Sequence, residues 1–495
     1  MKTPNLIGYH TSAEGTITFQ TVNPITDQLH PALFIEATNA EVDRSAILAK
    51  TAYRAFSRTS TLERAQFLKA ITTELECNKD ELIKTYCAES GLNEQRAEVE
   101  FARTIFQLTS FADLLSHEHW DVKHQENANP NRTPNPKPQL TKYKLGIGPI
   151  VVFGASNFPF AYSTVGGDTA SALAAGCPVI VKSHPFHANT SFKVAQLVVK
   201  VAQKLGLPEG VFSHLNASGY EVGKQLVQHP FIQGVGFTGS IKGGLSIQQL
   251  AQQRAIPIPV FAEMGSLNPV VILPSALKEH VESIATKLAL SITQSSGQFC
   301  TKPGALFLVK STETDRFLET FKSLFEQQAS YSMVHPTIAR TYTQKAKQVK
   351  DQVNVQLFAQ GISTTACNLG IPQLSITDGI TFDTNKLLQE EVFGPHALLV
   401  ICKDQLELEQ ILENIDGQLT FSIFHNEENI EGQNLFFLAQ EKAGRVILNG
   451  VPTGVEVSPA MQHGGPFPSS SDSRFTAVGT DSIKRFLRGI TVQRS

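Results

Sequence analysis

The chain has 495 residues, of which 41% are hydrophobic and 18% are charged, and this length is too great for one hydrophobic core, so two or three structural units are expected. The 45 acidic and 42 basic residues give a net charge of −3, which favours neither a nucleic acid nor an anionic membrane as a partner. No apolar run approaches ~18 residues, and the N-terminus lacks the apolar core of a secretory signal, so neither membrane insertion nor export is predicted.

The first part of the chain predicts a layer of helices. Apolar residues recur at three- and four-residue spacing between Ala46 and Phe56, Ser60 offers an N-cap for the next helix, and a third helix is expected over 94–115. Residues 127–139 contain four prolines, which keep this stretch extended. It is either a linker or an arm that crosses to another subunit.

Strands and helices alternate after this break. Buried strands are expected at 149–154, 178–182, 211–215, 234–237 and 259–262, with helices at 162–175, 190–205, 222–227 and 242–254. A second alternating unit is expected to contain strands 268–273, 397–401 and 444–448, helices 279–292 and 314–327, and a final short helix and strand over 482–492. This alternation predicts parallel, doubly wound sheets, which bind ligands, most often nucleotides, at the carboxyl ends of their strands.

The cysteines indicate a reducing compartment. The six are scattered, without a Cys-x-x-Cys pair or histidines at metal-ligand spacing, so free thiols, a cytoplasmic location and no metal site are predicted. One of them, Cys300, follows Gly297 and precedes the turn at Pro303 and Gly304, so it is expected in a loop. It is either a thiolate nucleophile or a small buried hydrophobe.

Three further side chains follow or end predicted strands. Asn157 either donates to a developing oxyanion or satisfies the backbone of its own turn. Lys182 is costly to bury unless a ligand anion or hydroxyl meets it, and otherwise marks an exposed strand end. Glu263 is either a desolvated base or a structural ion-pair partner.

Two turns complete the set of candidate ligand contacts. Gly239, Ser240 and Gly244 lie between a strand and a helix, where glycines and a helix N-terminus suit a diphosphate. Their spacing is neither that of a Gly-x-Gly-x-x-Gly turn nor that of a Walker loop. Glu391 forms an acidic pair with Glu390, and the aromatic Phe393 and a Gly-Pro turn follow this pair. The alternative for the acidic pair is a solvated face.

The order of these motifs strongly resembles the aldehyde dehydrogenase superfamily over nearly the whole chain. The family motif Pro-Trp-Asn-Phe-Pro corresponds to Ala-Ser-Asn-Phe-Pro at 155–159, its Glu-Leu-Gly-Gly motif to Glu-Met-Gly-Ser at 263–266, and its cysteine motif to 297–300. The resemblance implies NAD(P)-dependent oxidation of an aldehyde to a carboxylic acid through a cysteine thiohemiacetal and thioester. It implies these roles: Cys300 as nucleophile, Glu263 as general base, Asn157 with the Cys300 backbone N–H as oxyanion hole, Lys182 at the adenosine ribose, Gly239, Ser240 and Gly244 at the diphosphate, and Glu391 with Phe393 at the nicotinamide ribose and ring.

The resemblance also implies an α/β fold with two doubly wound Rossmann-type parallel-sheet domains and a small oligomerisation arm. The cofactor-binding domain is expected over 1–126 and 145–262, the catalytic domain over 263–460, and oligomerisation or bridging elements over 127–144 and 461–495. A homodimer or homotetramer is expected, with a small aldehyde as substrate.

Two longer stretches, 166–185 and 462–479, narrow the resemblance to the α-ketoglutaric semialdehyde dehydrogenase branch, while NADP-dependent fatty aldehyde dehydrogenases share much of the pattern and are the alternative. In those relatives a histidine that matches His463 lies near the cysteine and helps to activate it; otherwise His463 is an ordinary residue of a Gly-rich loop. An acidic semialdehyde needs a cation to face its carboxylate, and Arg474 is the candidate. A long-chain aldehyde would need an apolar funnel instead.

NADP is the expected cofactor, with NAD also accepted. NAD-preferring relatives often have a glutamate three residues after the lysine, which would repel a 2′-phosphate, and here that position is Pro185, with His184 beside it as a further contact. Tyr220 stands where NADP users of this branch often have an arginine, which argues against a strict preference.

Other classes of function fit fewer residues. A CoA-acylating enzyme would not need a base at Glu263, and a catalytically silent binding protein of the same fold would have lost Cys300, Glu263 or Asn157. A thioesterase-like hydrolase activity of the same cysteine is the remaining alternative, as a side activity, and p-nitrophenyl esters without cofactor would test it.

Overall fold

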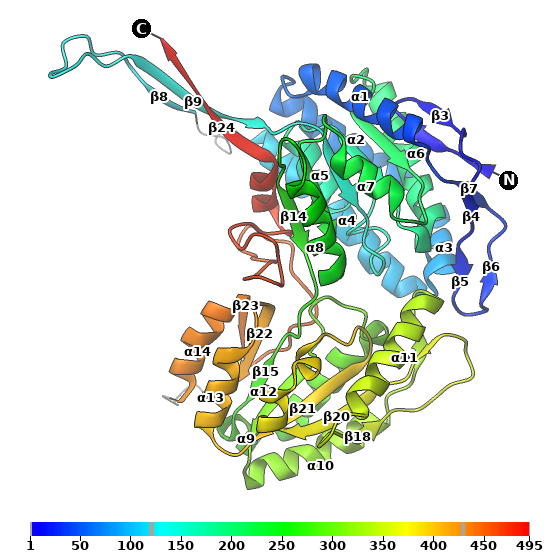
Figure 1. Ribbon diagram of the computed structural model, residues 1–495, viewed down its shortest axis with the longest axis vertical. Helices are drawn as coiled ribbons and strands as arrows, with labels where there is room; N and C mark the ends of the chain where they lie inside the picture. Colours follow the sequence, from blue (N-terminus) through cyan, green and yellow to red (C-terminus); the bar gives the residue numbers. More distant parts are fainter. Residues whose placement is uncertain (1, 118–122, 427–430, 495) are drawn as a thin grey trace.

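The computed structural model describes residues 2–117, 123–426 and 431–494 and has two lobes, each built on a seven-stranded sheet (Figure 1). The upper lobe in that view holds the chain as far as β14, the lower lobe holds β15 to β23, and the C-terminal tail returns to the upper lobe. No described helix is long and apolar enough to cross a membrane.

The sheet of the upper lobe is mainly parallel. Its strands, in spatial order, are β14 (Val260–Glu263), β13 (Gly234–Thr238), β10 (Ile150–Phe153), β11 (Val179–Lys182), β12 (Phe212–Leu215), β2 (Asn5–Ile7) and β3 (His10–Ser12). The first five run parallel to one another. Strand β2 pairs antiparallel with β12, and β3 pairs antiparallel with β2. Ile150 and Val152 belong to one hydrophobic core and Val151 to another, so both faces of the sheet are buried.

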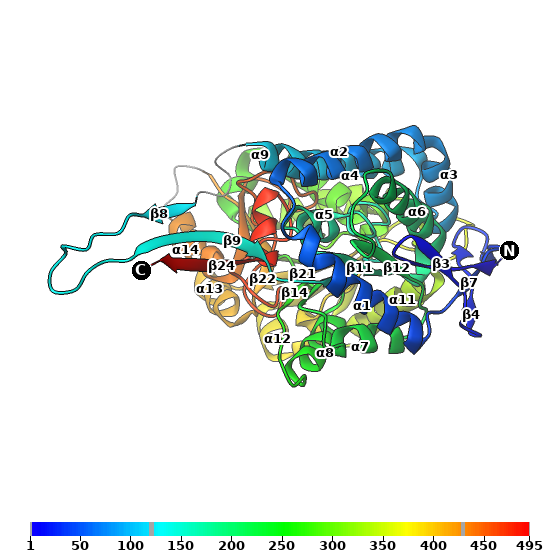
Figure 2. The same cartoon turned by 90° about the horizontal axis from the view of Figure 1, so that it is seen from above.

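Helices cover both faces of this sheet. Figure 2 shows α2, α4 and α6 on one side of β11 and β12 and α1, α7 and α8 on the other. The bounds in this lobe are α1 (Asn39–Phe56), α2 (Thr61–Cys77), α3 (Lys79–Ser90), α4 (Glu94–Ser116), α5 (Gly167–Ala174), α6 (Ala188–Lys204), α7 (Glu221–Gln228) and α8 (Ile241–Gln252). The helices α1 and α2 begin at reciprocal capping boxes, Thr38 with Glu41 and Ser60 with Glu63.

The sheet of the lower lobe has six parallel strands and one antiparallel edge strand. Its strands, in spatial order, are β18 (Gln356–Gln360), β20 (Gln373–Asp378), β21 (His396–Cys402), β16 (Ala305–Val309), β15 (Val270–Ile272), β22 (Gln418–Phe424) and β23 (Ala443–Leu448). Its helices are α9 (Pro274–Thr293), α10 (Thr312–Glu326), α11 (Pro336–Lys350), α12 (Gly379–Thr384), α13 (Gln405–Asn414) and α14 (Glu431–Lys442). The expectation of an α/β fold with two doubly wound parallel sheets is confirmed.

An arm of three antiparallel strands projects from the upper lobe (Figure 1). It consists of β24 (Leu487–Arg494), β9 (Gln139–Gly146) and β8 (His124–Glu126), and β24 pairs with β9 along its whole length. The proline-containing stretch is the connection between β8 and β9, so it forms the tip of a hairpin within the arm. Most residues of β24 are exposed.

The structure corrects three details of the predicted elements. The helix expected from residue 162 begins only at Gly167, because the Glu100 carboxylate accepts the backbone N–H groups of Phe160 (2.8 Å) and Ala161 (3.0 Å) and holds the chain in turns. Strands β16, β18, β20 and β22 of the second sheet were not predicted. The expected tail helix is a 3₁₀ helix over 480–486. The division into domains stays a prediction.

Candidate active site

Cys300 lies in a turn between a short 3₁₀ helix, η2 (Gln294–Gly297), and β16. The backbone enters this turn in the left-handed region, with φ between 50° and 62° over residues 295–297. A Cβ at Gly297 would lie 2.4 Å from the carbonyl oxygen of Gly394, so glycine is required for the two loops to approach this closely. Cys300 is thus held in a loop, as expected.

Two asparagines hold the Cys300 loop in place. Asn157, which follows β10, is 9% exposed and donates a hydrogen bond from Nδ2 to the Gln298 carbonyl at 2.9 Å. Asn268 is fully buried and donates from Nδ2 to the carbonyls of Cys300 (2.8 Å) and Lys302 (3.1 Å). The hydrogen bond to Gln298 uses one of the two N–H donors of the Asn157 amide. The other donor is not engaged by any described residue.

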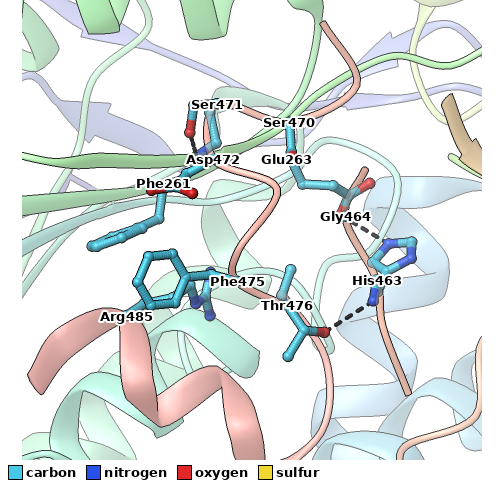
Figure 3. Close-up of a pocket in the computed structure, with 12 residues that line it drawn as sticks. Phe261, Glu263, His463, Gly464, Ser470, Ser471, Asp472, Phe475, Thr476 and Arg485 are labelled. Carbon is cyan, nitrogen blue, oxygen red and sulfur yellow. Dashed lines mark hydrogen bonds and ion pairs between the residues drawn. The ribbon is translucent and has the colours of Figure 1, made fainter. Parts of the chain in front are cut away.

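The C-terminal tail brings His463 to the end of β14. Here the Met264 backbone N–H donates to the Ser469 carbonyl at 2.8 Å, so the tail continues the edge of the sheet next to Glu263. The backbone N–H of His463 donates to Thr476 Oγ1 at 2.9 Å. Figure 3 shows the Glu263 side chain pointing from its strand toward the His463 ring. The tail therefore fixes the imidazole relative to the carboxylate.

Glu263, His463 and Cys300 form one cluster, in which the first two side chains are buried and Cys300 is half-buried. His463 Nε2 lies 3.1 Å from Glu263 Oε2 and 3.6 Å from Cys300 Sγ. Although the first distance is short, Glu263 Oε2 has no aligned hydrogen bond among the described residues. The three ligand atoms lie within 4.8 Å of one another, so the cluster has donors suited to a metal ion, a property that the sequence did not indicate. With Asn157 beside the same loop, all four predicted catalytic residues surround one site.

The electrostatics of the cluster keep the sulfur protonated. Burial raises the pKa of the Cys300 thiol well above its usual value, the negative charge of Glu263 raises it further, and the guanidinium of Arg103 opposes both. Burial also raises the pKa of Glu391, against the nearby ammonium of Lys302. At neutral pH the resting sulfur is therefore a thiol, and a base must remove its proton before it can react.

A cleft of about 790 Å³ opens between the lobes. The first turns of α8 form one wall and residues 386–391 form part of the other. Ser240 lines the cleft and caps α8 by accepting the Gly243 backbone N–H at 3.1 Å. Glu391 lines the opposite wall, where a Cβ at Gly265 would lie only 2.4 Å from its Oε2. Two of the predicted cofactor residues thus face one cavity.

Three other predicted cofactor residues do not line this cleft within the described part of the chain. A Cβ at Gly239 would lie 2.7 Å from the Phe237 ring, and one at Gly244 would lie 2.4 Å from Met264 Sδ. The close packing of these side chains is therefore sufficient to explain both glycines. Phe393 is half-buried in the loop after the cleft wall.

Lys182 ends β11 and is half-buried. Burial lowers the pKa of its ammonium group to about 8, against the charge of Glu36. Among residues 2–117, 123–426 and 431–494, none makes a hydrogen bond or ion pair with the ammonium group of Lys182. The Glu36 carboxylate instead accepts the backbone N–H groups of Ser218 (2.6 Å) and Gly219 (3.2 Å). A half-buried cation without a protein partner is the expected state of a residue that meets a ligand.

His184 and Tyr220 are the other two residues that bear on the choice of cofactor. Burial, together with His187 and Lys182, keeps the pKa of His184 well below its usual value, so its ring is uncharged. Its Nδ1 accepts the Phe186 backbone N–H at 3.3 Å. Tyr220 is 93% exposed at the start of α7.

The Arg474 candidate for the substrate carboxylate is wrong. Its side chain is 80% exposed and pairs with Asp472 at 2.6 Å, outside the buried cluster. Sequence reasoning missed Arg103, which lies next to the cluster, and Asn268, which holds its loop. A signal for Arg103 exists in α4, where residues 96, 100 and 103 place three charged side chains at helical spacing and the middle one is buried.

Comparisons with known proteins agree with this geometry. A model of the "Aldehyde dehydrogenase family" matches residues 10–489. The "Alpha-ketoglutaric semialdehyde dehydrogenase" of Acinetobacter baylyi is 40% identical over 480 residues, which cover 97% of this chain and 91% of that protein. The "Alpha-ketoglutaric semialdehyde dehydrogenase 2" of Azospirillum brasilense is 40% identical over 491 residues, with 99% and 93% covered.

Solved structures share the fold at low sequence identity. A 3,6-anhydro-L-galactose dehydrogenase in complex with NADP superimposes with a TM-score of 0.86 at 19% identity, covering 100% of both chains. A 1-pyrroline-5-carboxylate dehydrogenase from Thermus with bound NAD has a TM-score of 0.83 at 21% identity, covering 100% of this chain and 93% of that one.

Proposed function

Because the chain belongs to the aldehyde dehydrogenase family, whose members oxidise aldehydes to carboxylic acids, we propose that it oxidises α-ketoglutaric semialdehyde to α-ketoglutarate. The observation that carries the chemistry is the buried cluster in which a thiol, an imidazole and a carboxylate lie together. The 40% identity to two proteins of that name, over nearly the full length of each, supports the choice of substrate.

Cys300 is the nucleophile in this proposal. As its sulfur adds to the aldehyde carbon, the thiol proton passes to His463 Nε2, 3.6 Å from Sγ. The Glu263 carboxylate, 3.1 Å from the same nitrogen, stabilises the protonated imidazole. The second side-chain N–H of Asn157 and the backbone N–H of Cys300 donate to the oxygen that becomes negative.

Glu263 acts again in the second half of the reaction. A bound nicotinamide cofactor would be the oxidant, because it would accept the hydride that the substrate's aldehyde carbon loses. The acyl group then lies on Sγ of Cys300 as a thioester. Glu263 Oε2, which makes no aligned hydrogen bond with a described residue, takes a proton from the attacking water and later releases it to solvent. Collapse of the adduct breaks the carbon–sulfur bond and releases the carboxylic acid, and the proton held by His463 returns to the Cys300 sulfur.

Lys182 at the end of β11 and the residues of the cleft fit NADP, with NAD also accepted. The unpartnered ammonium of Lys182 suits a ribose hydroxyl or a 2′-phosphate, and Ser240 at the N-terminus of α8 suits the diphosphate. Glu391 suits the nicotinamide ribose. Pro185 presents no carboxylate to a 2′-phosphate, and the carboxylate of Glu36 is already held by backbone N–H groups.

Oxidation of long-chain aldehydes is the second candidate function. It is favoured by aromatic rings beside the cysteine: the Phe158 centroid lies 5.6 Å from that of Phe299 and 5.2 Å from that of Tyr162. Rings of this kind suit an apolar chain. The same wall also carries arginines, which a fatty chain would not use.

An aldehyde panel with both cofactors tests these proposals. We expect kcat/KM for α-ketoglutaric semialdehyde to exceed that for decanal at least about tenfold. The reason is that decanal has no carboxylate and so leaves unpaired the buried protein charge that would bind one. We expect NADP to support turnover at least as well as NAD. Faster oxidation of decanal would establish the second candidate function instead, and a large preference for NAD would refute the cofactor proposal.

The raised pKa of the thiol predicts how Cys300 reacts with iodoacetamide. Below the thiol pKa the thiolate fraction rises about tenfold per pH unit, so alkylation should accelerate from pH 7 through pH 9 without a plateau. The measurement is the rate of Cys300 modification by mass spectrometry, with the exposed Cys367 as internal reference. The substitution His463→Asn should slow alkylation of Cys300 at neutral pH. A rate that levels off below pH 8 would contradict the raised pKa.

We also expect a homodimer or homotetramer. The arm supports this expectation, because its eight-residue strand β24 is an exposed sheet edge, and such edges usually pair. Light scattering that found only monomer at micromolar concentration would contradict it. The free cysteines among the described residues support a reducing, cytoplasmic location.

A further inference from the structure

Two arginines from different elements converge on one loop beside the cluster. Arg103, on α4, donates from Nη1 to the Val455 carbonyl. Arg445, on β23, donates from Nη1 to the Gly454 carbonyl at 2.9 Å and from Nη2 to the Pro452 carbonyl. Residues 452–455 therefore carry two positive groups that are far apart in the sequence.

Both guanidinium groups act on the reactive sulfur. The charge of Arg103 lowers the pKa of Cys300, against burial. The Cys300 and Tyr162 side chains raise the pKa of the Arg445 guanidinium, also against burial. Arg103 Nη2 also donates to the Tyr162 hydroxyl at 3.2 Å, and the Tyr162 ring lies 6.4 Å from that of His463. Arg103 thus contacts a ring that lies next to His463, and Arg445 contacts the same loop, 452–455, as Arg103.

Neither arginine has an acidic partner in the described part of the chain. Their hydrogen bonds go to neutral carbonyl or hydroxyl oxygens, and the Nε of each is buried without a hydrogen-bond partner among the described residues. Other arginines are paired: Arg96 with Glu100 at 3.1 Å, and Arg474 with Asp472 at 2.6 Å. Two neighbouring cations that are half-buried without a counter-charge are costly in an empty site and favourable when an anion enters.

We propose that Arg103 and Arg445 form the subsite that binds the carboxylate of an oxo-acid aldehyde substrate. The inference rests on the proposed function and names the residues that select its substrate. An extended five-carbon semialdehyde places its carboxylate carbon about 5 Å from the aldehyde carbon, from standard carbon–carbon bond lengths. The subsite must therefore lie close to Cys300, and Arg103 meets this requirement through Tyr162, whose hydroxyl accepts its hydrogen bond and whose ring lies beside His463. A guanidinium is suited to the task because its planar donors match a carboxylate.

Selectivity is the quantity that tests the subsite. We compare kcat/KM for α-ketoglutaric semialdehyde with that for pentanal, which has the same number of carbons and no charge. In Arg103→Gln and in Arg445→Gln the ratio of the two values should fall roughly 10- to 100-fold, mainly through KM for the acidic substrate. Arg103→Lys should restore part of the ratio. Arg474→Gln, at the exposed arginine, should leave it unchanged.

Inhibition provides a second readout that does not depend on turnover of the acidic aldehyde. α-Ketoglutarate should compete with pentanal, and its inhibition constant should rise in both glutamine variants. An unchanged substrate ratio together with an unchanged inhibition constant would overturn the subsite, even if the wild-type enzyme prefers the semialdehyde. The wild-type enzyme could instead show no preference for α-ketoglutaric semialdehyde and oxidise succinic semialdehyde with a kcat/KM that falls in both glutamine variants. In that case the named substrate is wrong and the subsite stands.

Discussion

Replacing Cys300 by alanine should reduce aldehyde oxidation at least about 10⁴-fold, because the sulfur forms the covalent bond to the substrate and no other group replaces it. Its neighbours offer only a carboxylate and an imidazole, which move protons. The measurement is NAD(P)H formation with saturating aldehyde, together with cofactor affinity by fluorescence titration. We expect the affinity to change little, because the residues proposed to bind cofactor lie along the cleft and on β11.

The matched control is Cys367→Ala, which removes a thiol that is exposed and lies outside the cluster. This control should keep wild-type turnover. Substantial turnover by the Cys300 variant would remove the nucleophile assignment, and with it the proposed mechanism.

Replacing Glu263 by glutamine should separate the two halves of the reaction. The amide is nearly the same size but cannot take a proton from water, so thioester hydrolysis should slow roughly 10²- to 10³-fold. Acylation uses Cys300 and His463; it should slow because the protonated imidazole loses its carboxylate partner, but by less than hydrolysis does. Rapid mixing should therefore show a burst of about one NAD(P)H per active site, followed by a slow steady state.

The control for this variant is Glu319→Gln, on the exposed side of α10. It should show neither a burst nor a slower steady state. If Glu263→Gln instead lost the burst, the carboxylate would be needed for the attack of the sulfur, as a partner of His463, and its assignment to water activation would be wrong.

The sequence was most informative where a side chain acts at the end of a strand. Asn157, Lys182 and Glu263 follow or end three strands of one sheet, and the pattern of alternating strands and helices was sufficient to bring them to the same edge. The position of Cys300 in a loop followed from the glycines around it. These residues could be identified because their local sequence determines both the element and its end.

Residues that depend on packing between distant segments could not be identified in this way. Arg474 was chosen for its place in a characteristic stretch, but Asp472, two residues away, pairs with it in solvent. Arg103 was read as part of a helix because nothing near it in the sequence reveals that residues 452–455 cover it. The turns at 158–166 depend on the Glu100 carboxylate from another helix, so helical periodicity alone placed the start of α5 too early.

The cluster is divided between the lobes. Glu263 and His463 belong together on the upper lobe, since the tail that carries the imidazole is joined to β14 by backbone hydrogen bonds. Cys300 is carried by the other half of the molecule. If the two lobes move apart, Glu263 and His463 move together and their distance from the Cys300 sulfur increases. We therefore expect the sulfur to be unreactive whenever the lobes are apart. A ligand that binds between the lobes would then make the sulfur reactive. The reactivity of Cys300 would depend on ligand binding, and its thiol would be protected from oxidation in the absence of ligand.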